Sequence, residues 1–307
     1  MIFFSTDDPS FNTVPPDGYY AGSGWQWQGR YGYGTGTVVS PDQVLTAKHF
    51  AETDQFVIHG KAYAVLKTED DPHSDLRLLT LDVSAPGPFS SWAPLYTGSS
   101  EKGKEVVVHG RGRGRGEEVI VDDRLRGWLY ADTVSGLLQW GTNEVVEYAP
   151  YGNVENALLR AEFDLALAPT ECHLADWDSG GGVFLKVDGE WKLAGVNYAV
   201  DSRFATVTGN SATFQAALFD IRGMSKNGRV MPSAPGQIAS SFYATRVSRR
   251  LEWLSPRLRL EQKKSPPLLD PAAAAALVVF ALAGGGVVVG ARFARPREKT
   301  GVGNRRE

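Results

Sequence analysis

Short apolar runs separated by turn residues make up most of the chain. Residues 34–40 (GTGTVVS) and 43–46 (QVLT) are two such runs, and the Pro41-Asp42 pair between them is a typical turn sequence. Further strands are expected at residues 55–59, 62–66, 76–81, 106–110, 118–121, 137–140, 144–147, 183–186, 191–197 and 204–206. Many short strands at this spacing predict an all-β protein built from β-barrels.

Helix-like spacing of apolar residues begins only near residue 240. Phe242, Val247, Leu251 and Leu254 recur at intervals typical of one helix face, so a closing helix is expected over residues 241–256.

A second apolar stretch, residues 271–291, contains no charged side chain. As a helix it would span about 31 Å, close to the thickness of a bilayer core. The alternative is a buried Ala-rich helix, and the run of glycines at 284–286 weakens a spanning helix. The six arginines and lysines of residues 292–307 favour a membrane anchor followed by a basic cytoplasmic tail. Residues 257–270 are then a linker.

Composition narrows the class of protein further. A length of 307 residues allows one large or two medium cores, and a net charge of −3 does not point to a nucleic-acid partner. The Arg/Gly tract at 110–116 is followed by two glutamates and is interpreted as a glycine-rich turn between strands. The single cysteine, Cys172, excludes an intrachain disulfide and is interpreted as a small buried apolar residue. No His, Cys or Asp spacing indicates a metal site.

Three residues supply an imidazole, a carboxylate and a hydroxyl in distinct settings. His49 follows a predicted strand, Asp75 precedes the apolar run 76–81, and Ser179 lies between an aspartate and three glycines. Serine is a poor nucleophile until a base removes its proton, and a buried carboxylate can orient an imidazole for that work. We interpret Ser179 as nucleophile, His49 as base and Asp75 as the orienting group. Three carboxylates compete for the last role: Asp70, Asp71 and Asp82.

Six segments together resemble the trypsin-like, chymotrypsin-fold serine proteases over about residues 20–256. They are residues 36–40 with 44–49, 75–79, 107–110, 178–181, 193–198, and 243–247 with 253–254. The resemblance implies two six-stranded antiparallel β-barrels, at about 20–105 and 106–240, followed by the closing helix at 241–256. It also implies catalysis by His49, Asp75 and Ser179 without a cofactor.

The resemblance further assigns the binding residues. It implies an oxyanion hole made by the backbone N–H groups of Trp177 and Ser179, although Trp177 stands where the family usually has glycine. It places His173 at the floor of the specificity pocket, where the lack of an acid argues against strict preference for Arg or Lys. It also implies that four residues bind the substrate backbone: Gly195, Val196, Asn197 and Tyr198.

The two ends of the chain resemble bacterial exported trypsin-like proteins with a C-terminal anchoring segment of the PEP-CTERM kind. Residues 3–12 and the closing apolar run carry this likeness, while residues 266–271 (PPLLDP) replace the usual Pro-Glu-Pro. The expected location is outside the cytoplasm, anchored in the membrane. Because residues 1–4 are too short for a signal peptide, we expect further sequence before Met1.

We therefore expect a serine endopeptidase that cleaves protein or peptide substrates through an acyl-enzyme, without proteolytic activation. Two alternatives stay open. One is a binding protein that keeps the fold but has lost turnover because of Trp177, and the other is an esterase with the same three residues.

Overall fold

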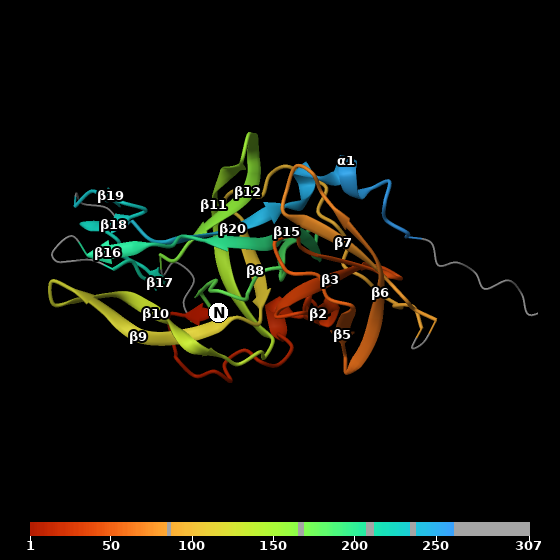
Figure 1. Ribbon diagram of the computed structural model, residues 1–307, viewed down its shortest axis with the longest axis horizontal. Coiled ribbons are helices and arrows are strands. Elements are labelled where there is room, and N and C mark those ends of the chain that lie inside the picture. The colour runs from red at the N-terminus through yellow and green to blue at the C-terminus, as the bar shows by residue number, and fades with distance from the viewer. Residues whose placement is uncertain (85–86, 165–168, 207–211, 234–237, 261–307) are drawn as a thin grey trace, which may run out of the picture. The chain divides into compact units, whose positions relative to one another are not determined.

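Two closed antiparallel β-barrels form the body of the protein in a computed structural model that describes residues 1–84, 87–164, 169–206, 212–233 and 238–260 (Figure 1). The first barrel has the strand order β2-β3-β4-β7-β6-β5, and the second has the order β11-β12-β20-β15-β14-β8. The predicted all-β architecture with two six-stranded barrels is confirmed.

The first barrel is built from hairpins between consecutive short strands. Its strands are β2 (Gln28–Tyr31), β3 (Gly34–Ser40), β4 (Gln43–Ala47), β5 (Gln55–Ile58), β6 (Lys61–Asp70) and β7 (Leu76–Leu81). The predicted β3–β4 hairpin is confirmed, because Ser40 pairs with Gln43 across the Pro41-Asp42 turn. Val38 points into the barrel while its neighbour Val39 packs toward the second barrel, as the alternation of a strand requires.

The second barrel uses longer strands. They are β8 (Glu105–Gly110), β11 (Gln139–Tyr151), β12 (Val154–Glu162), β14 (Gly182–Val187), β15 (Glu190–Val200) and β20 (Ser241–Arg246). The strands expected at 137–140 and 144–147 are one continuous strand, β11, which pairs first with β8 and then with β12. Gly141 lies between the two expected strands, and a Cβ there would come within 2.6 Å of Cys172 Sγ.

A shared apolar core joins the two barrels. Leu45 and Leu76 from the first barrel pack with Val107, Phe184 and Val196 from the second. Strands β4 and β7, which lead to His49 and Asp75, therefore lie on the side of the first barrel that meets the second.

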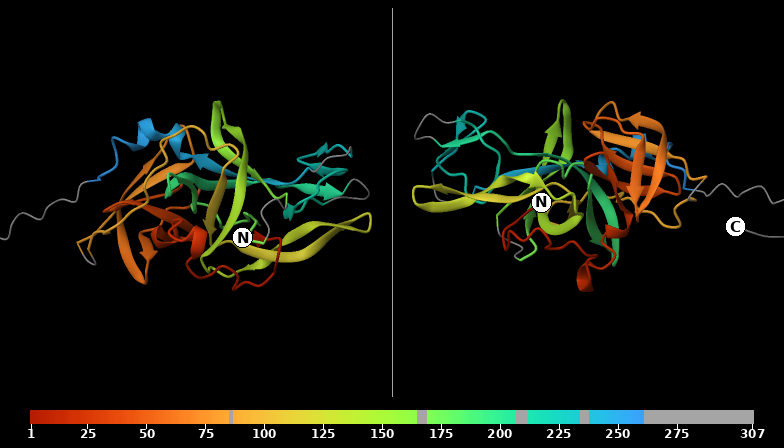
Figure 2. Two further views of the ribbon diagram at one scale, coloured as in Figure 1. Left: turned by 180° about the vertical axis from the view of Figure 1, so that it is seen from behind. Right: turned by 60° about the horizontal axis from the view of Figure 1, so that its bottom comes forward.

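Two small sheets are added to the second barrel and project away from the first (Figures 1 and 2). One joins the hairpin β9 (Arg113–Val121) and β10 (Arg124–Val134) to β17 (Ala216–Leu218), and the other contains β16 (Phe204–Thr206), β18 (Met224–Lys226) and β19 (Arg229–Val230). The hairpin turns at Asp122 and Asp123, both with positive φ, as a two-residue turn of this kind requires. Strand β9 thus begins within the Arg/Gly tract that was interpreted as a turn.

The N-terminal residues are buried beside these added sheets. Strand β1 (Ile2–Phe3) pairs with β13 (Cys172–His173). Phe4 meets Trp128, Phe163 and Phe219 edge-on. Aromatic contacts of this geometry add to the stabilisation from burial.

The expected closing helix at 241–256 is wrong in its first half. Residues 241–246 form β20, which pairs with β12 and β15 and so closes the second barrel. Within the described residues after it, 247–260, the helical elements are the 3₁₀ turn η3 (Val247–Arg249) and the short helix α1 (Leu251–Leu254). The helix-like spacing failed because barrel closure, which depends on distant strands, outweighs local periodicity.

Within the described ranges, no helix is long and apolar enough to cross a bilayer. The predicted anchor at 271–291 and the basic tail at 292–307 lie outside the described residues.

A buried ion pair ties β20 to the segment before β8. Glu101 accepts two hydrogen bonds from Arg246, at 2.8 and 2.6 Å, and both side chains are less than 5% exposed. Burial alone would raise the pKa of Glu101, but the hydrogen bonds from Arg246 and Ser248 lower it below its ordinary value.

Glu101→Gln should reduce the free energy of unfolding at pH 7 by about 3–5 kcal/mol, because the buried charge of Arg246 would lose its carboxylate partner. The matched control, Glu147→Gln, breaks the exposed Lys102–Glu147 pair and should leave the free energy of unfolding nearly unchanged, because solvent screens that pair. Urea denaturation measures both.

The pH dependence of the same variant adds a second readout. The stabilisation by ionised Glu101 is complete above the ordinary carboxyl pKa of about 4.3 and is lost as the pH falls through its lower folded-state value. The gap between the parent and Glu101→Gln should therefore shrink in acid. If Glu101→Gln lowers the free energy of unfolding at pH 7 no more than Glu147→Gln does, this account is contradicted.

Candidate active site

The pairing of β4 with β7 brings His49 and Asp75 together. Ala47, at the end of β4, pairs with Leu76, at the start of β7. His49 follows the first by two residues and Asp75 immediately precedes the second. His49 Nδ1 lies 2.7 Å from Asp75 Oδ2, and the backbone N–H of His49 donates to Asp75 Oδ1 at 3.1 Å.

The surroundings of this pair determine which ring nitrogen carries a proton. The Asp75 side chain is 3% exposed and that of His49 is 40% exposed. An ionised carboxylate only accepts hydrogen bonds, so Nδ1 of the neutral ring carries the hydrogen and Nε2 keeps its lone pair. Lys48 supports the arrangement, because its backbone N–H donates to the Asp75 carbonyl and its Nζ donates to Ser74 and Asp71 carbonyls.

The three competing carboxylates have other partners. Asp70 binds Arg77, Asp71 binds Arg250, and Asp82 accepts hydrogen bonds from Ser84. Asp75 is thus the carboxylate that the fold places against the imidazole.

Ser179 lies in a tight loop that is hydrogen-bonded to the first barrel. The backbone N–H of Thr35, on β3, donates to the Ser179 carbonyl at 3.1 Å. Strand β3 is the neighbour of β4, which leads to His49, so this bond ties the serine loop to the strand pair that carries the imidazole. Within the described residues no hydrogen bond joins Ser179 Oγ to His49 Nε2. In substrate-free enzymes such contacts are commonly long and tighten only when substrate binds.

Asn197 fixes the other side of the serine loop. Its Nδ2 donates to the carbonyls of His109, at 2.7 Å, and Asp178, at 3.0 Å. Its backbone carbonyl accepts from Gly180 and its N–H donates to Gly181, both at 2.9 Å. Three of these hydrogen bonds hold the loop around Ser179, and the fourth ties Asn197 to β8.

Asp178 carries a fully buried carboxylate directly before Ser179. The ammonium group of Met1 lies 3.2 Å from its Oδ2, and neither side chain is exposed. The N–H groups of Gly112 and Ala175 also donate to it, at 2.7 and 2.9 Å. Burial raises the pKa of Asp178, and the ammonium and the two N–H groups oppose that rise.

Trp177 has a left-handed backbone, with φ of +75°. Glycine adopts this conformation without steric cost, whereas a bulky residue pays about 1–3 kcal/mol for it. Trp177 thus adopts the kind of conformation that the usual glycine would favour. In the described part of the chain, the backbone N–H groups of Trp177 and Ser179 have no protein acceptor, so both are free to bind a ligand oxygen.

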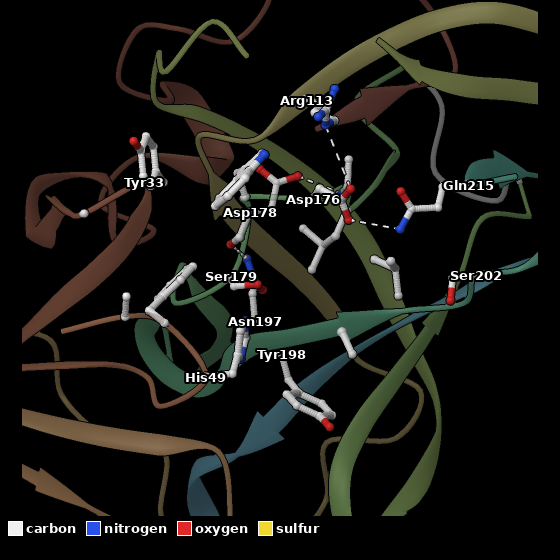
Figure 3. A pocket seen from close by; sticks show the side chains of 18 of the residues that line it. Tyr33, His49, Arg113, Asp176, Asp178, Ser179, Asn197, Tyr198, Ser202 and Gln215 are labelled. Carbon is white, nitrogen blue, oxygen red and sulfur yellow. Dashed lines mark hydrogen bonds and ion pairs between the residues drawn. The ribbon is translucent and has the colours of Figure 1, made fainter. Parts of the chain in front are cut away.

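One cavity of about 710 Å³ contains His49 and Ser179 (Figure 3). Of the predicted substrate-binding residues, Asn197 and Tyr198 line it. Gly195 and Val196 are instead buried within β15, where they pair with β14.

The structure places His173 away from the cavity wall. Its ring is fully buried and contacts the Leu174 carbonyl and Ser240 Oγ. Burial lowers the pKa of His173 to about 4, so it is neutral near pH 7. The wall beside it is formed by Leu174 and Ala175.

Sequence reasoning missed several cavity residues. Tyr33, Val200, Ser202 and Gln215 line the cavity but belong to no motif. Tyr33 precedes the predicted hairpin at residues 34–46, and no local pattern marks any of the four residues. The contact between the Met1 ammonium and Asp178 was also missed. The two residues are 177 positions apart, and no local sequence pattern predicts that they meet.

A family model of the trypsin-like peptidase domain matches residues 34–196, which is more than half of the chain. Among solved structures, the chain is similar to neuropsin, a serine protease expressed in the limbic system of mouse brain. The two are 13% identical with a TM-score of 0.49, and the match covers 76% of this chain and 96% of neuropsin. No curated protein matches the chain. The protein belongs to the trypsin-like peptidase family.

Proposed function

We propose that the protein is a serine endopeptidase that uses Ser179, His49 and Asp75. The observation that carries the proposal is the 2.7 Å contact between His49 Nδ1 and buried Asp75, with Ser179 in the same cavity. The Nε2 lone pair of His49 is then available to a serine hydroxyl and to a leaving group in turn.

The proposed reaction has two halves. Ser179 Oγ attacks the scissile carbonyl carbon and its proton passes to His49 Nε2, while Asp75 stabilises the imidazolium. The carbonyl oxygen becomes negative and accepts hydrogen bonds from the N–H groups of Trp177 and Ser179. His49 returns the proton to the departing amine, which leaves an acyl ester on Ser179. Water then repeats the sequence and releases the acid.

The free edge of β15 supports binding of an extended substrate. β14 pairs with β15 only as far as Val196, and the backbone groups of Asn197 are used by the serine loop. A substrate backbone would therefore add itself along residues 198–200 as an extra strand. We therefore propose that the substrate backbone binds Tyr198 and the two residues after it. Gly195 and Val196, which were expected to bind it, already pair with β14.

A binding protein without turnover remains the alternative class, and the bulky, left-handed Trp177 is the feature that favours it. An esterase with the same residues is the alternative within enzymes. Both are outcomes of the experiment below.

A fluorophosphonate probe tests the nucleophile, since Ser179 Oγ would displace its fluoride. We expect covalent labelling of the parent, no labelling of Ser179→Ala, and full labelling of the control Ser84→Ala on an exposed loop. Casein hydrolysis should fall on the order of 10⁶-fold in Ser179→Ala and 10⁴-fold in Asp75→Asn. An unlabelled parent would favour the binding protein, and labelling with cleavage of simple esters but not of casein would favour the esterase.

The chain that begins at Met1 should hydrolyse casein without limited proteolysis, because an ammonium group already neutralises Asp178. Adding Gly-Ser before Met1 would displace that charge and leave a buried carboxylate unpaired, at a cost of about 3–5 kcal/mol. We expect probe labelling to slow by at least about tenfold, whereas Gly-Ser added after residue 307 should have no effect. Equal rates for the two extended chains, or a parent active only after proteolysis, would overturn this expectation.

We also propose that residues 271–291 anchor the protein in a membrane with its catalytic body outside the cytoplasm. The apolar run followed by six basic side chains supports this. The full chain should sediment with phosphatidylcholine vesicles at high salt, and a chain ending at residue 260 should stay in solution. Full-length protein that stays in the supernatant would refute the anchor.

A further inference from the structure

The first barrel contributes an uncharged aromatic wall to the cavity. Apart from His49, its lining residues are Gly32, Tyr33, Phe50, Ala51 and Thr53. Trp177 faces this wall, because its ring lies 5.1 Å from that of Tyr33 at an angle of 54°.

A tight turn sets the backbone of Tyr33, and the residue is 78% exposed. It occupies the second position of a two-residue turn closed by the Tyr31–Gly34 pair. Gly32 has φ of +57°, which such a turn requires at its first position. A large apolar ring exposed on a fixed turn beside a nucleophile is already positioned for a ligand.

Trp177 has no packing role that would account for its backbone conformation. Within the described residues, it belongs to none of the apolar cores, and its ring contacts Tyr33. A costly left-handed tryptophan beside a nucleophile is characteristic of a residue kept for function.

The wall lies on a definite side of Ser179. Figure 3 shows Tyr33 on one side of Ser179, with Ser202 and Gln215 on the opposite side. Strand β15, along which the acyl half of a substrate would pair, belongs to the Ser202 side. The Tyr33 side is therefore open to the half that departs as the amine.

We infer that Tyr33 and Trp177 form a binding site for an uncharged aromatic or large apolar side chain in the leaving half of the substrate. This inference rests on the proposed function. Aromatic rings stack favourably on such a pair and bury apolar area against it, whereas a carboxylate would lose solvation without gaining a partner.

Capture of the acyl-enzyme by amines tests this site independently of the acyl side. An N-acetyl amino acid p-nitrophenyl ester loads Ser179 and releases nitrophenolate. The nitrogen of an added amino acid amide then attacks the acyl carbon, the bond to Ser179 Oγ breaks, and the amine proton returns to Oγ through His49. The ratio of peptide to free acid, measured by chromatography, reports binding of the amide.

We expect phenylalanine amide and leucine amide to capture the acyl group about tenfold better than glycine amide or aspartate amide. Tyr33→Ala should remove most of this preference and Tyr33→Phe should keep it. Tyr19→Ala, which alters an exposed tyrosine that does not line the cavity, should behave as the parent.

The outcomes separate the two proposals. No release of nitrophenolate by the parent overturns the proposed function, and the site with it. Turnover with equal capture of all amides, a preference for arginine amide, or a preference that survives Tyr33→Ala overturns the aromatic site alone.

Discussion

The buried carboxylate of Asp178 is the group on which the arrangement around Ser179 depends. A carboxylate with no exposed surface needs compensation, and in a chain that starts at Met1 an ammonium and two backbone N–H groups supply it from three separate segments. These contacts hold the turn that carries Trp177 and Ser179, and the N-terminal strand β1 packs against the core of the second barrel. The same interaction joins the N-terminus, the start of β9 and the serine loop into one unit.

The two barrels contribute different parts of the candidate site. The first barrel positions His49 and Asp75 through the register of β4 and β7, which places the imidazole against the Asp75 carboxylate. The second barrel holds Ser179, and the bond from Thr35 to the Ser179 carbonyl links the two. A change in the packing between the barrels would therefore alter the distance between His49 and Ser179 without touching either residue.

Local patterns predicted the parts of the molecule that local chemistry determines. The β3–β4 hairpin and the short strands follow from turn residues and side-chain alternation, and the segments around His49, Asp75 and Ser179 were recognisable because each has a distinctive flank. Residues 241–246 were misread as helix because the deciding demand, closure of a barrel by distant strands, leaves no local trace. The Met1–Asp178 pair and the cavity wall at Tyr33 were missed for the same reason.

The central claim is that Ser179 is a nucleophile whose developing oxyanion faces the free N–H groups of Trp177 and Ser179. A crystal structure of the protein after reaction with a fluorophosphonate tests this most directly. The account predicts phosphorus bonded to Ser179 Oγ, with a phosphonyl oxygen within hydrogen-bonding distance of both N–H groups. A phosphonyl group bonded to another residue would contradict it. So would a structure in which the Trp177 carbonyl, and not its N–H, points toward the phosphonyl oxygen.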